Sequence, residues 1–484
     1  MSNTYLLVIK GIHFFAGGSI KMSTFFSRVI LCFASLFMLW LPAAGAAYAA
    51  VGPGNVKVGL AIQADTIGFK TSGAYHLVEQ STGKEITRLE QGEQWQVRVE
   101  NGQIMLEGRK ERLGPFAGPV TVSELDLSFN VLSGTGQAVE SSSSGHFFVL
   151  NGEGELSPFN SIDNPYAASS QKKTALTAAG DGLNLVSLIS GAASARYRGS
   201  LEFRVENGKL AVVNELNIED YLRGVVPAEI PPSWPKEALK AQAVAARNYA
   251  LQQVEVSRGS KYNLLDDQLS QVYRGYDAET PATNEAVEET RGMVMTSQGR
   301  LITAFFHACS GGFTENSEDV WLEQLPYIKG KADPYDKNDK HYDWQVDYTV
   351  EQLVAKLQGS GYNLAVLEDI EELARTSSGA RIKSIAVSGQ GTSGEPVRIV
   401  ISNADKVRNA LGLKSSLFTL EKVYDQEGIL QGIKICGSGN GHGLGMSQWG
   451  ARGMAAQGYN YQEILKYYYT GVEITGDYGR SASR

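Results

Sequence analysis

Residues 224–235, GVVPAEIPPSWP, place four prolines around a single carboxylate, Glu229. Proline fixes its own φ and pushes the residue before it towards extended conformations, so Ile230 and Pro231 are expected to be extended. The segment therefore predicts a stiff, strand-like approach to a helix that opens at Pro235, where proline is tolerated. Apolar neighbours would raise the pKa of Glu229 by desolvation, as a general acid requires. The alternative is an exposed surface glutamate.

The alanine-rich stretch that follows, PKEALKAQAVAARNYALQQ, has the spacing of an amphipathic helix. Its expected core stripe consists of Leu239, Ala243, Ala246 and Ala250. Two polar residues, Gln242 and Arg247, interrupt the alanines. We predict that they support a site, with Arg247 pairing with a carboxylate to set its pKa or position. Either residue could instead be purely structural.

A second candidate segment is FFHACSGGFTENSEDVW, residues 305–321, in which His307, Ser310 and Gly311 are predicted to contact substrate. Glycine pairs allow a backbone to approach a ligand closely. A nucleophile formed by Cys309 with His307 is a weaker alternative, because residues two apart on a strand share a face without necessarily hydrogen-bonding. The segment could also be a turn with incidental polar groups.

A third candidate segment is CGSGNGHGLGMSQWGARGM, residues 436–454, a glycine-rich loop followed by an expected helix. It lacks the Lys-Ser/Thr of a phosphate-binding loop and the spacing of a dinucleotide fingerprint. We therefore predict that the loop places His442 beside a ligand, with Ser447 and Gln448 as further supporting residues.

Zinc-compatible side chains occur in both segments, at His307, Cys309, Cys436 and His442, but their spacing fits no usual zinc template. Cys309 and Cys436 could instead form a disulfide or stay free. No cofactor is required by the sequence, and zinc remains an open alternative.

The N-terminus has the order of a secretory signal. Lys21 and Arg28 precede the apolar run VILCFASLFMLWL, and Ala47-Tyr48-Ala49 is a plausible cleavage site. The run is shorter than the ~20 residues that span a bilayer, although an uncleaved membrane anchor is an alternative. Met22 is a possible true start. These features predict a secreted or wall-associated protein outside the cytoplasmic membrane.

Composition and pattern indicate an α+β fold. The chain of 484 residues has a net charge of −8 and no long basic cluster, which disfavours nucleic acid as a partner. Short alternating strands and an Asn-Gly hairpin at 101–102 predict a β-rich N-terminal module, residues 51–135. After the signal at 1–50 and this module, we expect a weakly patterned linker at 136–185, a mixed α/β catalytic domain at 186–475 and a flexible tail at 476–484.

Four stretches in order resemble the stage II sporulation protein D family, which includes the amidase-enhancer proteins. They are NELNIEDYLRGVVPAEIPPSWPKEALKAQAVAARNYAL, AFFHACSGGFTENSEDVW, NADKVRNALGLKSS and GHGLGMSQWGARGMAAQGYNYQEILKYYYTGVEI, and the resemblance covers roughly residues 186–475. It implies a lytic transglycosylase that cuts peptidoglycan between N-acetylmuramic acid and N-acetylglucosamine, on strands already stripped of peptides by an amidase. The family's Glu-Met-Pro motif matches Glu229-Ile230-Pro231, which makes Glu229 the implied catalytic acid. Some relatives bind zinc through His and Cys, but those ligands cannot be placed on this sequence.

Three functions follow as alternatives. The first is a secreted lytic transglycosylase acting on glycan strands in wall remodelling or sporulation. The second is a non-enzymatic glycan-binding protein that stimulates a partner N-acetylmuramoyl-L-alanine amidase. The third is a metal-assisted hydrolase built on His307 and His442. Anhydro-muramic ends in the products would separate the first from the other two.

Overall fold

The computed structural model describes residues 54–125 and 183–476 apart from Leu269 and Leu322, together with four short strands between them. These are β9 (Ser128–Leu132), β10 (Ala138–Ser142), β11 (Phe148–Leu150) and β12 (Leu156–Pro158). Val51–Arg484 forms one compact unit, and the expected signal at 1–50 lies outside the described residues, as do most of the expected linker and tail. No helix in the described ranges has the length and apolarity needed to cross a bilayer.

Two large sheets contain strands from both sides of the undescribed stretch. One has the order β17-β1-β16-β15-β8-β3-β4, and the other has the order β14-β13-β2-β5-β6-β7. The bounds are β1 (Asn55–Ala64), β2 (Thr66–Ser72), β3 (Tyr75–Glu79), β4 (Lys84–Leu89), β5 (Gln94–Glu100), β6 (Gln103–Glu107), β7 (Arg112–Phe116), β8 (Val120–Glu124), β13 (Leu185–Ser190), β14 (Ala193–Tyr197), β15 (Ser200–Glu206), β16 (Lys209–Asn217) and β17 (Leu264–Leu265).

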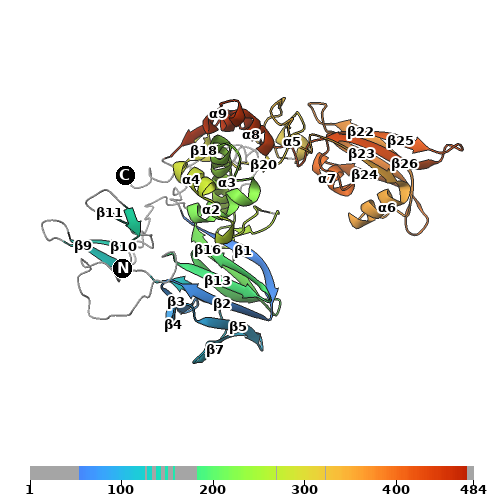
Figure 1. The fold of residues 1–484 in the computed structure, drawn as a ribbon. Helices are drawn as coiled ribbons and strands as arrows, with labels where there is room; N and C mark the ends of the chain where they lie inside the picture. Colours follow the sequence, from blue (N-terminus) through green and yellow to red (C-terminus); the bar gives the residue numbers. More distant parts are fainter. Residues whose placement is uncertain are drawn as a thin grey trace, which may run out of the picture. The chain divides into compact units, whose positions relative to one another are not determined.

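The expected β-rich N-terminal region is present, but its strands pair with strands of the region that was expected to begin at 186. β1 pairs with β16 from Asn55↔Asn217 to Ala64↔Leu210, and β2 pairs with β13 (Figure 1). Their inward side chains share one core, in which Val58, Phe69 and Phe203 are completely buried. Neither set of strands could bury its apolar face alone, so the two sequence regions form one structure.

The Asn-Gly hairpin expected at 101–102 is confirmed, and a second Asn-Gly pair forms a hairpin in the same way. Asn101 and Gly102 connect β5 to β6, and Asn207 and Gly208 connect β15 to β16. All four residues have positive φ, the conformation that two-residue hairpin turns require and that asparagine and glycine tolerate best.

Helices α2 (Ile218–Glu229) and α3 (Lys236–Val256) flank the proline-rich segment. The α3 prediction is confirmed, with Pro235 at its N-cap and the expected apolar stripe buried. The approach to it differs from expectation, because Pro227 lies inside α2 and Glu229 is the last residue of that helix. A proline so close to a helix end removes only one backbone bond, and burial of Val225 and Val226 favours continued helix. Ile230 adopts the expected extended conformation as the C-cap.

A buried ion pair joins α2 to α3. Arg247 Nε donates to Glu219 Oε1 over 2.9 Å, and Arg247 Nη2 donates to Glu219 Oε2 over 2.7 Å. Both side chains are about 1–2% exposed. The carbonyl of Met293 accepts from the guanidinium, and the N–H of Gly292 donates to the carboxylate. This network satisfies most of the polar atoms that the pair removes from water.

The remaining elements of the described chain complete an α+β fold, as predicted. They include α4 (Pro281–Glu289), η2 (Tyr276–Ala278), β18 (Val294–Ser297), β19 (Arg300–Leu301), β20 (Phe306–His307), α5 (Ser317–Val320), β27 (Met446–Ser447), α8 (Gln448–Ala456), α9 (Tyr461–Tyr468) and β28 (Glu473–Thr475). Helices α8 and α9 pack against α3, and parallel pairing of β20 with β27 joins the second and third candidate segments.

Residues 343–438 build two further three-stranded sheets with a core of their own, seen in orange in Figure 1. The elements are β21 (Asp343–Thr349), α6 (Val350–Gly359), β22 (Val366–Arg375), β23 (Ile382–Gln390), β24 (Pro396–Ser402), α7 (Ala404–Ala410), β25 (Phe418–Tyr424) and β26 (Leu430–Ser438). A capping box of Thr349 and Gln352 opens α6, and Asn403 caps α7.

Replacing Arg247 by alanine should lower the free energy of unfolding by about 3–5 kcal/mol, because Glu219 would be left buried without its partner. Chemical denaturation monitored by circular dichroism measures this loss. Arg258→Ala, at an exposed position after α3, is the control and should change stability by less than about 0.5 kcal/mol. A loss for Arg247→Ala no larger than for Arg258→Ala would show that the ion pair contributes nothing to stability.

Candidate active site

Glu229 ends α2 as a half-buried carboxylate. The backbone N–H of Val272 donates to Glu229 Oε1 over 2.9 Å. Burial raises the pKa of Glu229, and this effect is opposed by the Val272 N–H, the Gln448 amide and the charge of Arg274. Burial therefore favours the neutral form of Glu229, whereas the Val272 N–H, the Gln448 amide and Arg274 stabilise its carboxylate form.

Gln242 and Gln448 lie together next to this acid. Gln448 begins α8, and its Nε2 donates to Gln242 Oε1 over 3.4 Å. Gln242 is about 1% exposed, and its own Nε2 has no partner among the described residues. An unpartnered buried donor is costly, so this amide is a candidate for binding substrate or ordered water.

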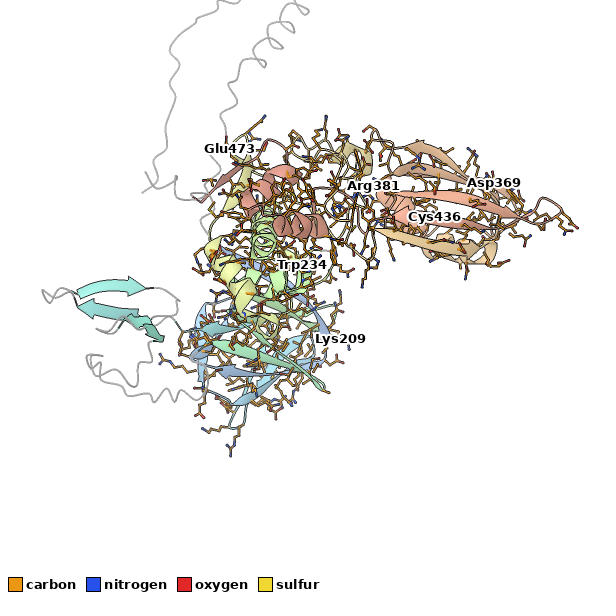
Figure 2. The ribbon with its side chains drawn as sticks, turned by 45° about the horizontal axis from the view of Figure 1, so that its top comes forward. Lys209, Trp234, Asp369, Arg381, Cys436 and Glu473 are labelled. Atoms are coloured by element: carbon orange, nitrogen blue, oxygen red, sulfur yellow. The ribbon has the colours of Figure 1, made fainter. Side chains whose placement is uncertain are left out.

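An aromatic pair lies beside the amides. The rings of Trp234 and Trp449 meet edge to face with centroids 5.1 Å apart, and both rings are half-buried (Trp234 is labelled in Figure 2). The guanidinium of Arg452 lies 4.8 Å from the Trp449 centroid and 5.8 Å from the Trp234 centroid. Tyr249 on α3 lies close enough for the charge of Glu229 to raise its pKa, in addition to the larger effect of burial.

Sequence reasoning missed these neighbours. Trp234 and Trp449 stood inside quoted motifs, but the sequence did not show that the two rings meet beside Glu229. The contact of the Val272 N–H with Glu229 could not be predicted from the sequence, because every residue except proline carries a backbone N–H.

Arg247 is not placed at Glu229. Its guanidinium is occupied by Glu219 and by backbone carbonyls, as described above. The expectation that it pairs with a carboxylate is met, but that carboxylate is Glu219 and the role is to hold two helices together.

Ser310, Gly311 and Ser447 gather around Asp336, a completely buried carboxylate. Asp336 Oδ2 accepts from the Ser310 N–H and hydroxyl at 2.6 Å each, from the Gly311 N–H at 3.0 Å and from the Ser447 hydroxyl at 3.3 Å. Gly311 has φ +74°, and a Cβ there would lie 2.6 Å from the backbone of Gly439. The hydrogen bonds to Asp336 therefore connect these residues to one another, and the residues do not line a surface that is open to substrate.

His307 and His442 are neighbours whose rings are 5.3 Å apart. His442 accepts from the Leu444 N–H at Nδ1 and meets the Phe306 carbonyl at Nε2, so both its nitrogens are used by backbone. His307 is 5% exposed, and its Nδ1 meets the Leu444 carbonyl over 3.1 Å. Burial is the largest cause that lowers the pKa of both rings. Both therefore stay neutral and hold the glycine loop in place.

The cysteines do not come together as a disulfide, and both are free. Cys309 is buried, with its thiol 3.3 Å from Asp336, whereas Cys436 is exposed on β26. Burial and the Asp336 charge raise the pKa of Cys309, and its thiol meets Asp336, so the surroundings favour the neutral thiol. Within the described ranges, no three His, Cys, Asp or Glu side chains converge as a metal site, so the zinc-compatible set does not fit a zinc ion.

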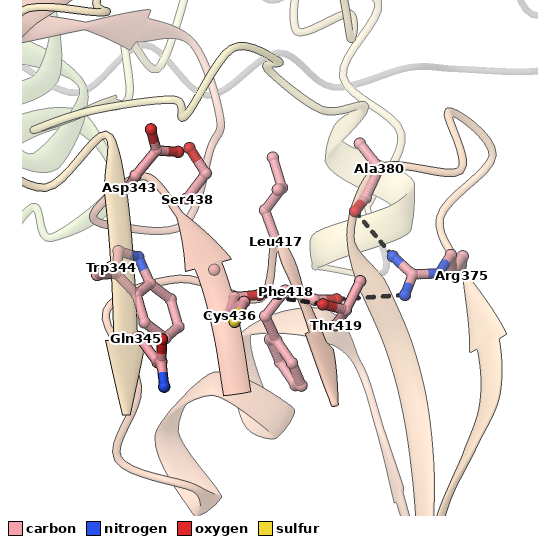
Figure 3. Close-up of a pocket in the computed structure, with 11 residues that line it drawn as sticks. Asp343, Trp344, Gln345, Arg375, Ala380, Leu417, Phe418, Thr419, Cys436 and Ser438 are labelled. Carbon is pink, nitrogen blue, oxygen red and sulfur yellow. Dashed lines mark hydrogen bonds between the residues drawn. The ribbon is translucent and has the colours of Figure 1, made fainter. Parts of the chain in front are cut away.

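An open pocket of about 610 Å³ lies elsewhere, on the β21-β26-β25 sheet (Figure 3). Its lining includes Trp344, Arg375, Phe418 and Cys436, and none of the residues around Glu229. The Arg375 guanidinium already donates to the carbonyls of Ala380 and Phe418. We therefore place the candidate site at Glu229 and not in this pocket.

Comparison with known proteins gives consistent results. The family description "Stage II sporulation protein" matches residues 206–297, which include Glu229 and its helices, and a domain family of unknown function matches residues 313–445. An uncharacterised protein of Brachyspira hyodysenteriae is 39% identical, over 59% of this chain and 73% of its own length.

Named relatives agree with the family description. Stage II sporulation protein D of Bacillus subtilis is 31% identical over 54% of this chain and 76% of its own length. That of Bacillus amyloliquefaciens is 32% identical over 54% of this chain and 75% of its own length. The amidase enhancer of Bacillus subtilis is 32% identical, over 52% of this chain and 40% of its own length. With both the motifs around Glu229 and these relatives in agreement, the chain belongs to the stage II sporulation protein D family.

Proposed function

We propose that this protein is a peptidoglycan lytic transglycosylase that cleaves glycan strands after an amidase has removed their peptides. Membership of the family supports a role connected with the cell wall and sporulation. The observation that carries the finer proposal is the environment of Glu229, where burial raises the pKa while the Val272 N–H remains aimed at Oε1.

The reaction needs one group that first donates and then accepts a proton. Glu229 protonates the glycosidic oxygen between N-acetylmuramic acid and N-acetylglucosamine as the C1–O bond breaks. The Glu229 carboxylate then takes the proton of the muramic acid C6 hydroxyl, whose oxygen bonds to C1 and closes a 1,6-anhydro ring. No water is consumed, and Glu229 ends the cycle protonated. General acid–base catalysis of this kind is typically worth about 10²–10⁴-fold.

A single acid is sufficient for this route. Ordinary glycosidases use a second carboxylate to activate water or to attack the sugar. The charge that acts on the pKa of Glu229 is that of Arg274, which lowers it. The internal C6 hydroxyl removes the need for that second acid.

Substrate contacts are proposed for the groups beside Glu229. The faces of Trp234 and Trp449 suit sugar rings, and the spare Gln242 N–H suits a sugar hydroxyl or acetamido oxygen. The signal-like N-terminus supports an action outside the cytoplasmic membrane, where such strands occur. No metal takes part in the steps proposed here.

A second candidate function is stimulation of an amidase without glycan cleavage. It is favoured by the 32% identity with the amidase enhancer of Bacillus subtilis. Under this alternative the Glu229 cluster would bind glycan and the chain would make no anhydro product.

Glu229→Gln should abolish formation of anhydro-muramic ends on amidase-stripped strands, because glutamine keeps the size of the side chain but cannot deliver a proton. Mass spectrometry of the products measures this, with melting and glycan binding followed on the same preparation. Glu285→Gln, on exposed α4, is the matched control and should retain activity. Parent-like cleavage by folded Glu229→Gln would exclude Glu229 as the acid. The amidase-enhancer function would be supported if the parent, too, makes no such product.

The raised pKa of Glu229 also predicts how its stability contribution depends on pH. An acid with a folded-state pKa above its unfolded value contributes stability below the unfolded pKa, and this contribution is lost as pH rises through the folded pKa. Glu229→Gln should therefore gain stability relative to the parent on going from pH 4 to pH 8, as measured by melting temperatures across that range. A difference between the two proteins that does not change with pH would contradict the raised pKa.

A further inference from the structure

We propose that Arg452, whose guanidinium lies over the rings of Trp234 and Trp449, binds the carboxylate that an amidase exposes on the lactyl group of each muramic acid, an inference that rests on the proposed function. Arg452 would then be the residue that makes this site prefer stripped strands.

The position of Arg452 on α8 connects it to the acid. Gln448, whose amide acts on Glu229, precedes Arg452 by four residues, and Trp449 precedes it by three. Side chains at these spacings lie on one face of a helix, about one turn or ~5.4 Å apart along its axis. Gln448, which acts on the acid, and Trp449 therefore lie on the same side of α8 as the cation.

The charge of Arg452 is uncompensated. Its described interactions are the two contacts with the tryptophan rings, and within the described parts of the chain no carboxylate pairs with it. Nearby cations on α3 differ, because Lys236 and Lys240 both pair with Glu289. Arg452 is half-exposed, so its charge remains available to a ligand.

The stacking also prepares the guanidinium for a carboxylate. Aromatic rings cover a guanidinium through its faces and leave the N–H groups on its edge free to donate. A planar fork of donors matches the two oxygens of a carboxylate, and such charge-assisted pairs are about twice as strong as neutral hydrogen bonds. The contacts with Trp449 and Trp234 place the guanidinium beside the rings that are proposed to contact the sugars.

The chemistry of the strand supplies the matching anion. While the stem peptide is attached, the lactyl carbonyl of muramic acid is an amide and carries no charge. Hydrolysis of that amide by an amidase leaves a carboxylate on every muramic acid and none on N-acetylglucosamine. A single cation near Glu229 would therefore distinguish stripped from unstripped strands and muramic acid from N-acetylglucosamine.

Binding to Glu229→Gln, which prevents turnover, tests the proposal by titration calorimetry. The probes are amidase-stripped glycan strands and a chitin oligosaccharide, which has no lactyl group. Adding Arg452→Gln should weaken binding of stripped strands roughly 10–100-fold, the range for a lost charge-assisted hydrogen-bonded pair. Binding of the chitin oligosaccharide should stay within about 2-fold, and Arg452→Lys should recover part of the loss because it keeps the charge without the fork.

Arg196→Gln is the matched control, because Arg196 also stacks on an aromatic ring, that of Tyr276, but does not belong to the Glu229 cluster. It should leave the binding of both probes unchanged. Equal weakening of both probes by Arg452→Gln would show that Arg452 only holds the tryptophans, and no weakening of either would also overturn the proposal. Arg452-dependent binding by a protein whose parent makes no anhydro product would support this inference while rejecting the proposed catalysis.

Discussion

The geometry of the site depends on the buried ion pair between Arg247 and Glu219. Glu219 lies in the first turn of α2 and Glu229 at its end, so fixing one end of this helix constrains the position of the acid. Arg247 fixes the same point to α3, which also carries Gln242. Desolvating two charges is expensive, and the backbone partners from Gly292 and Met293 offset part of that cost. The ion pair therefore fixes the position of α2, which ends in Glu229, relative to α3, which carries Gln242.

The proposed reaction requires Glu229 to be a neutral carboxyl in one step and a carboxylate in the next. Protonating a leaving oxygen requires a neutral carboxyl, and burial favours that form of Glu229. Accepting the second proton requires a stable carboxylate, which the Val272 N–H and the Gln448 amide favour. Glycosidases that use water divide these tasks between two carboxylates with different pKa values. In our account one carboxyl performs both tasks, because the nucleophile is a hydroxyl of the substrate.

Local features of the fold were predictable from sequence, whereas long-range ones were not. The backbone preferences of proline, asparagine and glycine predict the helix after Pro235 and the hairpin turns. The prolines on either side of Glu229 marked it as a candidate residue. The pairing of β1 with β16 depends on which apolar faces meet, and no local pattern encodes that choice. The role of His442 beside a ligand stays a prediction, because a glycine-rich loop can serve a ligand or its own backbone, and the sequence did not show that the ring meets Leu444 and Phe306. Trp234 and Trp449 stand far apart in the chain and become a pair only after folding.

The central claim is that bond cleavage at Glu229 closes a ring within the sugar and consumes no water. The most direct measurement is digestion of amidase-stripped strands in water labelled with heavy oxygen, followed by mass spectrometry of the new muramic acid ends. Our account predicts ends that lack one water relative to a hydrolysed product and carry no heavy oxygen. Ends that contain heavy oxygen at C1 would show that water is the nucleophile, and they would contradict the account.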